Sequence, residues 1–184
     1  MGQLKQLLPL GSRTVIEHSV QALLSAEVPD IVVVIGPQGA DVSSAIEYLS
    51  VAVAVNPDSS SDMAASVRVG LNALKDHTSS VLVCPVDHPL VLPETIKRLL
   101  SLQQKNPDAI IIPSHNRRRG HPTLFPRNII LEIFESSSLR DIVSRNEPLI
   151  EYLDVQDPGV VLDMDTPEDY ALILQEYAGR KENK

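Results

Sequence analysis

The sequence is poor in cysteine, in long apolar runs and in positive charge, and each shortage excludes a class of protein. Its 184 residues include one cysteine, Cys84, which excludes an intrachain disulfide framework and a zinc site built from several cysteines. The longest apolar runs extend about five residues, whereas a membrane-spanning helix needs ~20. Because 16 Lys and Arg face 24 Asp and Glu, the formal net charge is −8, which argues against sequence-independent binding to nucleic acid phosphates.

A secretory signal and a glycine-rich dinucleotide-binding motif are also absent from the sequence. Residues 1–5 show no apolar stretch of a secretory signal, and with the single cysteine this makes a reducing cytoplasm the expected compartment. No Gly-x-Gly-x-x-Gly follows a predicted strand, which disfavours a flavodoxin-like or dehydrogenase fold. The remaining mix, 43% hydrophobic and 22% charged, is typical of an ordinary globular domain. The length predicts a single domain over residues 1–184, with a frayed tail over 180–184.

Short apolar runs alternate with amphipathic stretches through the first part of the chain. The runs are rich in β-branched residues and suit strands buried on both faces; they cover 31–35, 51–55, 81–83 and 109–112. Stretches with helical spacing begin at Thr14, Met63 and Pro93, and Thr14 with Glu17 has the spacing of a capping box. Over about 110 residues this alternation predicts an α/β fold with a mainly parallel sheet.

The rhythm changes after Pro113. Residues 149–155 and 160–162 are predicted as short strands, more antiparallel in character. A last helix is predicted to start at 166–169, where the threonine can cap and the proline suits the first helical position, and to end near 178–179.

Acidic residues at predicted strand ends suggest a metal site. Asp87 follows the run 81–83, and ligands bind at the carboxyl ends of strands in open parallel sheets. A carboxylate there suits Mg²⁺, which takes one or two carboxylates plus phosphate oxygens; the alternative is a loop aspartate that forms a turn before Pro89. Asp163 and Asp165 lie two residues apart, so they share one face of a strand, and one of them facing Asp87 would complete the site.

Other polar residues are candidate ligand contacts. Ser66 adds a hydroxyl near a helix N-terminus, which can bind anions, although Asp62 acting as a plain N-cap explains that helix start equally well. Beside a nucleotide, Lys5 would neutralise triphosphate charge; otherwise it is a surface lysine. Cys84 is most simply a small buried residue on a strand.

A basic segment stands out in this acidic protein. Residues 117–119 are all arginine and suit a phosphorylated acceptor, because arginine forks match phosphate; the alternative, favoured for the first two, is a solvated charge run. In the frame Gly120-His121-Pro122, His121 would point into the cleft, or else have a structural role. The other histidines show no ligand spacing; they are His18, His77, His88 and His115.

Five motifs, taken in order, resemble those of the MobA-like NTP transferases, and most closely their molybdenum cofactor cytidylyltransferase branch. The resemblance covers essentially the whole chain. The motifs are Met1-Gly2-x-x-Lys5-x-Leu7-Leu8-Pro9, Ser66-Val67-x-x-Gly70-Leu71, Pro85-Val86-Asp87-x-Pro89, Gly120-His121-Pro122-Thr123-Leu124-Phe125 and Asp163-Met164-Asp165-Thr166-Pro167-Glu168-Asp169.

The resemblance implies a three-layer αβα Rossmann-like fold with helices on both faces of a mainly parallel sheet, like that of nucleotide-diphospho-sugar transferases. It implies attack by a pterin phosphate on the α-phosphate of CTP, with release of pyrophosphate and Mg²⁺ as cofactor. A molybdoenzyme or chaperone would be the protein partner, with no role for nucleic acid or membrane. The implied residues are Asp87, Asp165 and Asp163 for the metal, Lys5 and Asp87 for catalysis, Lys5, Ser61 and Ser66 for the nucleotide, and Gly120, His121 and Pro122 for the acceptor.

Two departures from the family pattern keep alternatives open. The family's first strand and Leu-Ala-Ala-Gly-type phosphate loop are absent, a unit of roughly 15 to 20 residues. Asp62 stands where the branch has a glycine. One alternative is a nucleotidyltransferase-like binding or accessory protein without catalysis. The other is the same chemistry with GTP, or with a sugar or polyol phosphate acceptor.

Overall fold

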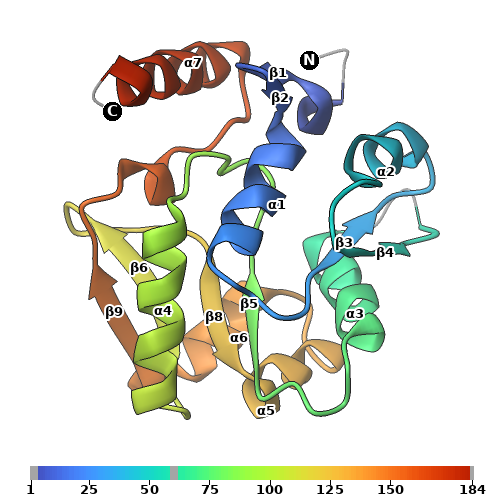
Figure 1. Cartoon of the computed structure of the whole chain (residues 1–184). Helices are drawn as coiled ribbons and strands as arrows, with labels where there is room; N and C mark the ends of the chain where they lie inside the picture. Colours follow the sequence, from blue (N-terminus) through green and yellow to red (C-terminus); the bar gives the residue numbers. More distant parts are fainter. Residues whose placement is uncertain (1–3, 59–61, 183–184) are drawn as a thin grey trace.

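Three sheets and the helices around them appear in the computed structural model, which describes residues 4–58 and 62–182 (Figure 1). The strands are β1 (Pro9–Leu10), β2 (Arg13–Thr14), β3 (Val32–Ile35), β4 (Ala52–Val55), β5 (Ser80–Val83), β6 (Ile110–His115), β7 (Arg118–Arg119), β8 (Thr123–Pro126) and β9 (Ile150–Asp154). The α-helices are α1 (Val15–Ser25), α2 (Ala40–Ile46), α3 (Met63–Ala73), α4 (Pro93–Lys105), α5 (Arg127–Ile130), α6 (Leu139–Arg145) and α7 (Pro167–Glu182). The 3₁₀ helices are η1 (Lys5–Leu7), η2 (Leu131–Phe134), η3 (Glu147–Leu149) and η4 (Pro158–Val161).

The apolar runs predicted as strands form β3, β4, β5 and β6. Ile110 and Ile112 of β6 pack in one core with α3, α5 and α6, whereas Ile111 between them packs against α4. Because successive side chains of a strand point to opposite faces, a strand covered on both faces needs apolar residues at every position. Helices therefore cover both faces of the larger sheet, and the predicted three-layer αβα fold is confirmed.

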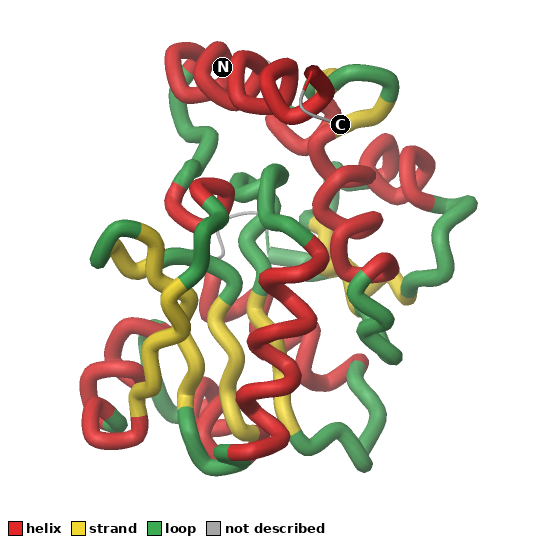
Figure 2. Tube along the Cα trace, turned by 60° about the vertical axis from the view of Figure 1, so that its left-hand side comes forward, coloured by secondary structure: helices red, strands yellow, loops and turns green. Residues whose placement is uncertain are grey.

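Most long strands of the larger sheet point the same way. β6 and β9 are parallel, and β8 runs antiparallel between β5 and β6, so β5, β6 and β9 share one direction. Figure 2 shows these strands side by side with α4 crossing in front of them. β3 and β4 pair in parallel as a sheet of their own, and within residues 4–58 and 62–182 neither pairs with β5. The mainly parallel direction of the long strands is confirmed, with β8 and the short β7 running antiparallel to them.

Helix starts follow the predicted capping residues. The Glu17 amide donates to Thr14 Oγ1 at 3.4 Å and the Thr14 amide donates to Glu17 Oε2 at 2.7 Å, which completes the capping box of α1. The Asp62 carboxylate accepts from the Ala65 amide at 2.9 Å at the start of α3, and Pro93 lies in the first turn of α4. The capping side chains satisfy amides that the first turn of a helix leaves without an intrahelical partner.

Two strand predictions in the C-terminal part need correction. The strand predicted at 149–155 exists as β9, but it pairs with β6 in parallel, not antiparallel. The strand predicted at 160–162 is wrong, because the chain forms η4 there. The Asp157 carboxylate accepts from the Gly159 amide at 3.0 Å and closes a turn that an extended strand could not make.

The last helix is longer than predicted. α7 continues past residues 178–179 to Glu182, so 180–182 of the tail predicted to fray are helical, and 183–184 lie outside the described residues. Arg180 anchors this end, since its guanidinium donates to the Leu90 carbonyl at 2.5 Å and to Asp157 at 3.3 Å. Although α7 is long, neither it nor another helix of the described residues has the length and apolar character to cross a membrane.

One apolar cluster joins the N-terminal segment, the loop after β5 and the segment before α7. Its buried members are Leu10, Val15, Leu90, Met164 and Ile173. Burying a side chain of this size contributes ~1.5–3 kcal/mol. The three segments consequently meet beyond one end of the larger sheet, on the side where α7 and the β1–β2 hairpin lie in Figure 1.

Candidate active site

Three charged side chains from distant parts of the sequence meet beyond the carboxyl end of β5. Lys5 Nζ donates to Asp87 Oδ2 at 3.2 Å and to Asp165 Oδ1 at 2.9 Å. Asp87 lies in the loop after β5, and Asp165 lies in the segment before α7. The Lys5, Asp87 and Asp165 side chains are 30%, 22% and 64% exposed, so the group opens to solvent on the Asp165 side.

Asp163 lies near this group without joining the Lys5 contacts. The predicted placement of Asp163 and Asp165 on one face of a strand is wrong, because their segment is not a strand. The outcome is similar, because Met164 is fully buried while Asp163 and Asp165 on either side are exposed. The negative charge of Asp163 acts on His121, which places Asp163 on the side of the Gly120-His121-Pro122 segment.

The charges at the site stabilise one another. Burial raises the pKa of Asp87, but the hydrogen bond from His88 and the charge of Lys5 outweigh burial and lower that pKa from 3.8 to about 2. Burial lowers the pKa of Lys5, whereas its hydrogen bond to Asp165 and the charge of Asp87 raise it above 10.5 overall. At neutral pH the group is therefore an ammonium ion beside carboxylates.

His88 orients Asp87, a role that sequence reasoning missed. His88 Nδ1 donates to Asp87 Oδ1 at 2.8 Å, and the His88 side chain is only 10% exposed. This bond leaves Asp87 Oδ2 to face Lys5. The available signal was adjacency, since His88 directly follows the predicted metal ligand in a proline-flanked loop. Metal-ligand spacing does not detect a histidine that acts through a neighbouring carboxylate.

The Gly120-His121-Pro122 segment approaches from the start of β8. The His121 ring lies edge-on to His88, with centroids 4.8 Å apart, and its peptide bond to Pro122 is cis. Burial and the charge of His88 lower the pKa of His121. His121 Nδ1 is buried and has no hydrogen-bond partner in the described part of the chain. A neutral imidazole in this place can donate through one nitrogen and accept through the other.

η4 lies between the loop that carries Asp87 and the loop that carries His121. The His121 amide donates to the Val160 carbonyl at 2.8 Å, and a Cβ on Gly120 would overlap that same carbonyl. On the other side, a Cβ on Gly159 would overlap the Leu90 carbonyl. Both glycines permit backbone approaches that any other residue would prevent, so η4 sets the spacing between the two loops.

The oxygen atoms around Lys5 suit a hard divalent cation. Asp87 Oδ2 and Asp165 Oδ1 converge on one ammonium group, so a single cation fits between them. Among the described residues, no three or more His, Cys, Asp or Glu side chains form a group that could hold a metal. Mg²⁺ commonly uses one or two carboxylates and completes its octahedral shell with waters and substrate phosphates. The residues present therefore fit a metal bound together with a phosphate ligand.

The predicted nucleotide contacts lie at the ends of other elements. Ser66 is in α3, and its Oγ accepts from Asn56 Nδ2 at 3.2 Å, just after β4. Within the described ranges, Ser66 makes no hydrogen bond to Lys5 or Asp87. The Asp62 carboxylate caps α3, which confirms the simpler interpretation of that helix start. Ser61 lies outside the described residues.

The basic segment is a tight hairpin between β6 and β7. Asn116 and Arg117 form its turn, with φ of 50° and 64°. Arg118 and Arg119 follow as exposed residues of β7, and the Arg119 guanidinium lies 5.1 Å from the centre of the Tyr152 ring. Arg119 thus packs on an aromatic face, and no contact joins the hairpin to the Lys5 group in residues 4–58 and 62–182.

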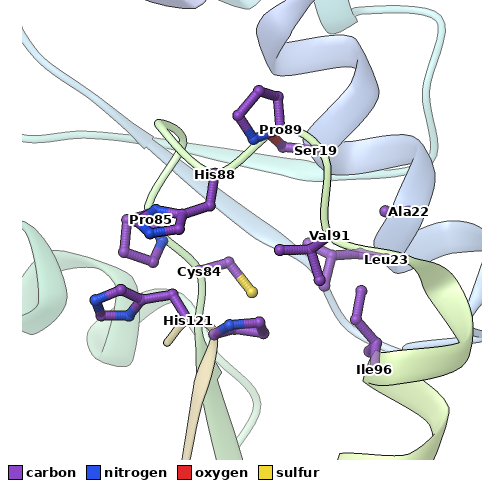
Figure 3. A pocket seen from close by; sticks show the side chains of 11 residues that line it. Ser19, Ala22, Leu23, Cys84, Pro85, His88, Pro89, Val91, Ile96 and His121 are labelled. Atoms are coloured by element: carbon purple, nitrogen blue, oxygen red, sulfur yellow. The ribbon is translucent and has the colours of Figure 1, made fainter. Parts of the chain in front are cut away.

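A small cavity lies beside the two histidines (Figure 3). Cys84, His88 and His121 line it together with residues of α1 and α4, and its volume of about 20 Å³ admits about one water molecule. A ligand larger than a water molecule therefore does not fit in this cavity. Cys84 is exposed and follows β5, so its prediction as a buried strand residue is wrong.

Comparison with known proteins identifies relatives over nearly the whole chain. The molybdenum cofactor cytidylyltransferase of Escherichia coli K12 is 24% identical over 179 residues, covering 96% of this chain and 90% of the relative. The nicotine blue oxidoreductase of Paenarthrobacter nicotinovorans is 26% identical over 181 residues, covering 92% and 87%. The manganese complex of Rv0371c from Mycobacterium tuberculosis H37Rv shares the fold, with a TM-score of 0.79, 23% identity and 95% and 93% coverage.

The three-layer αβα fold, with one carboxylate after β5 and a second before α7, is that of a nucleotidyltransferase. Residues 1–150 match the MobA-like NTP transferase domain. The chain belongs to the MobA-like NTP transferase family.

Proposed function

We propose that the protein is a Mg²⁺-dependent cytidylyltransferase that transfers CMP from CTP to a molybdopterin-type phosphate. An oxygen of the acceptor phosphate attacks the α-phosphorus of CTP, the bond from that phosphorus to the bridging oxygen breaks, and pyrophosphate leaves. The observation that carries the proposal is the convergence of Asp87 and Asp165 on a single cation. The relationship to a cytidylyltransferase across 96% of the chain supports the choice of CTP.

Asp87 and Asp165 would hold the metal, with Asp163 beside them, and Lys5 would contact the phosphates. The bound metal would neutralise charge on the phosphates and on the leaving pyrophosphate. His88 keeps Asp87 Oδ2 directed toward the cation position. No protein nucleophile is needed, because rate enhancement in phosphoryl and nucleotidyl transfer comes mainly from positioning and charge stabilisation.

Gly120, His121 and Pro122 would bind the acceptor, and Ser61 and Ser66 would lie on the nucleotide side. The buried, unpartnered Nδ1 of His121 supports the first assignment, because a ligand group there would satisfy it. A molybdoenzyme or its chaperone is the protein partner we propose for the product, in a cytoplasmic setting.

Nucleotide binding without turnover is a second candidate function. The Asp62 carboxylate accepts from the Ala65 amide at the start of α3, a place where a phosphate could otherwise bind. A carboxylate in that place repels phosphate, so binding would be weaker or differently placed than in a catalytic site.

Pyrophosphate release distinguishes the two candidates. The purified chain is incubated with Mg²⁺, molybdopterin and either CTP or GTP, and with CTP and a sugar or polyol phosphate. We expect release with CTP and molybdopterin, and a loss of at least 100-fold, about 2.7 kcal/mol or more, in Asp87→Asn. Asp108→Asn, an exposed aspartate before β6, is the matched control and should keep full activity. Binding of CTP without pyrophosphate release by any acceptor would establish the second candidate instead.

A further inference from the structure

The positive charge between Asp87 and Asp165 is the ammonium group of Lys5. Lys5 Nζ lies 3.2 Å from Asp87 Oδ2 and 2.9 Å from Asp165 Oδ1. A divalent metal held by the same two oxygens would need nearly the same space. The ammonium group and a metal ion therefore cannot both occupy this position.

His88 fixes which oxygen of Asp87 faces Lys5. His88 Nδ1 donates a hydrogen bond to Asp87 Oδ1 at 2.8 Å. The His88 side chain is nine-tenths buried, so its ring has little room to rotate away. The remaining oxygen, Asp87 Oδ2, is the one that Lys5 holds. A metal that bridges Asp87 Oδ2 and Asp165 Oδ1 must consequently displace Lys5.

Lys5 can be displaced because its side chain is open to solvent on the Asp165 side. Its side chain is 30% exposed, and Asp165, its second partner, is 64% exposed. The lysine stem is long and flexible and carries a compact charge that suits a phosphate as well as a carboxylate. Phosphates of a bound nucleotide would give the ammonium group a new partner and leave the two carboxylates to the metal.

We propose that Lys5 is the resident cation of the Asp87–Asp165 pair and that it makes metal binding dependent on nucleotide binding. This inference rests on the proposed function. In the absence of nucleotide, Lys5 competes with the metal; in its presence, the phosphates draw Lys5 away, and each ligand increases the affinity for the other. Such couplings between ligands are reciprocal and typically amount to about 5–150-fold in affinity.

Metal titration without turnover tests the competition. Mn²⁺ is titrated into the wild-type chain and into Lys5→Met, with and without CTP, and free Mn²⁺ is followed by electron paramagnetic resonance. We expect Lys5→Met to bind Mn²⁺ alone about 5–150-fold more tightly than the wild type and to lose most of the increase that CTP produces. Lys75→Met is the matched control, because it removes a lysine paired with Asp30 elsewhere and changes the net charge equally.

Thermal unfolding provides a second readout. Without metal, Lys5→Met leaves two facing carboxylates uncompensated, so its melting temperature should lie below that of the wild type. Mn²⁺ should raise the melting temperature of Lys5→Met by more than it raises that of the wild type. A merely structural loss would not be recovered by metal.

The outcomes separate this inference from the proposed function. Equal Mn²⁺ affinity of wild type and Lys5→Met, with Asp87→Asn weaker than both, would overturn the competition and leave the metal site in place. If Asp87→Asn binds Mn²⁺ as the wild type does, with and without CTP, the metal site of the proposed function is refuted together with the competition.

Discussion

Replacing Asp157 by alanine should be among the most destabilising single changes in this protein. The Asp157 carboxylate is 1% exposed. It accepts hydrogen bonds from the Leu92 amide at 2.8 Å, the Thr95 hydroxyl at 2.8 Å and the Gly159 amide at 3.0 Å, and it pairs with Arg180 at 3.3 Å. It thereby joins the start of α4, the turn of η4 and the end of α7.

The magnitude follows from what the substitution leaves behind. Removing one partner of a buried ion pair costs about 3–5 kcal/mol, because the remaining charge and donors lose their compensation. A single hydrogen bond to a charged group contributes about 1.5–3 kcal/mol, so losing several of them agrees with the same range. At about 2–4 °C per kcal/mol for a protein of this size, Asp157→Ala should melt about 6–20 °C below the wild type.

Urea unfolding followed by far-ultraviolet circular dichroism measures this loss, since the sequence has no tryptophan for fluorescence. Asp157→Asn keeps one oxygen acceptor and should lie between alanine and wild type. Asp108→Ala, an exposed aspartate, should change the free energy of unfolding by less than about 0.5 kcal/mol. If the free energy of unfolding of Asp157→Ala falls by less than about 1 kcal/mol, or by no more than that of Asp108→Ala, the hydrogen bonds of Asp157 do not stabilise the fold to this extent.

Three further predictions concern stability and can be measured by the same denaturation assay. Gly159→Ala should lower the free energy of unfolding by about 1–3 kcal/mol, because its Cβ overlaps the Leu90 carbonyl. In Gly179→Ala the added Cβ would meet no atom of another segment within 4 Å, so helix propensity should raise the free energy of unfolding by about 0.5–1 kcal/mol. Equal effects of the two substitutions would contradict the close approach at Gly159. The lowered pKa of Asp87 stabilises the fold above pH 3.8, and this contribution of about 2 kcal/mol should fade as pH falls toward 2. In Asp87→Asn the extra acid sensitivity should be missing, and its persistence would assign it to other carboxyl groups. Thr14→Ala removes half of a capping box and should cost about 0.5–2 kcal/mol, with an unchanged midpoint as the contrary result.

Local patterns predicted four helices and five strands correctly, α1, α3, α4, α7 and β3, β4, β5, β6, β9, because their causes lie within a few residues. The Thr14 capping box, the Asp62 cap and the proline start of α4 all depend on side chains near the helix end. The apolar runs predicted strands because burial on both faces requires apolar residues at every position. The strand predicted at 160–162 failed because a buried side chain, Asp157, imposes a turn there through contacts with α4 and α7.

The candidate site was only partly predictable. Asp87 and Asp165 could be singled out by their places after a strand and before a helix, and the structure brings both to Lys5. His88 was missed because its function depends on which oxygen of Asp87 it binds. The direction of β9, the length of α7 and the exposure of Cys84 likewise depend on neighbours distant in sequence.

The sequence by itself determined the α/β class, the strands and helices whose signals are local, and the residue types able to bind a cation and phosphates, since these follow from composition and short-range spacing. Only the tertiary structure decided that one ammonium group, from Lys5, stands between carboxylates 82 and 160 residues away. The physical reason is burial: the cluster around Leu10, Leu90 and Met164 brings three segments together, and the charged residues beside them must then compensate one another at close range.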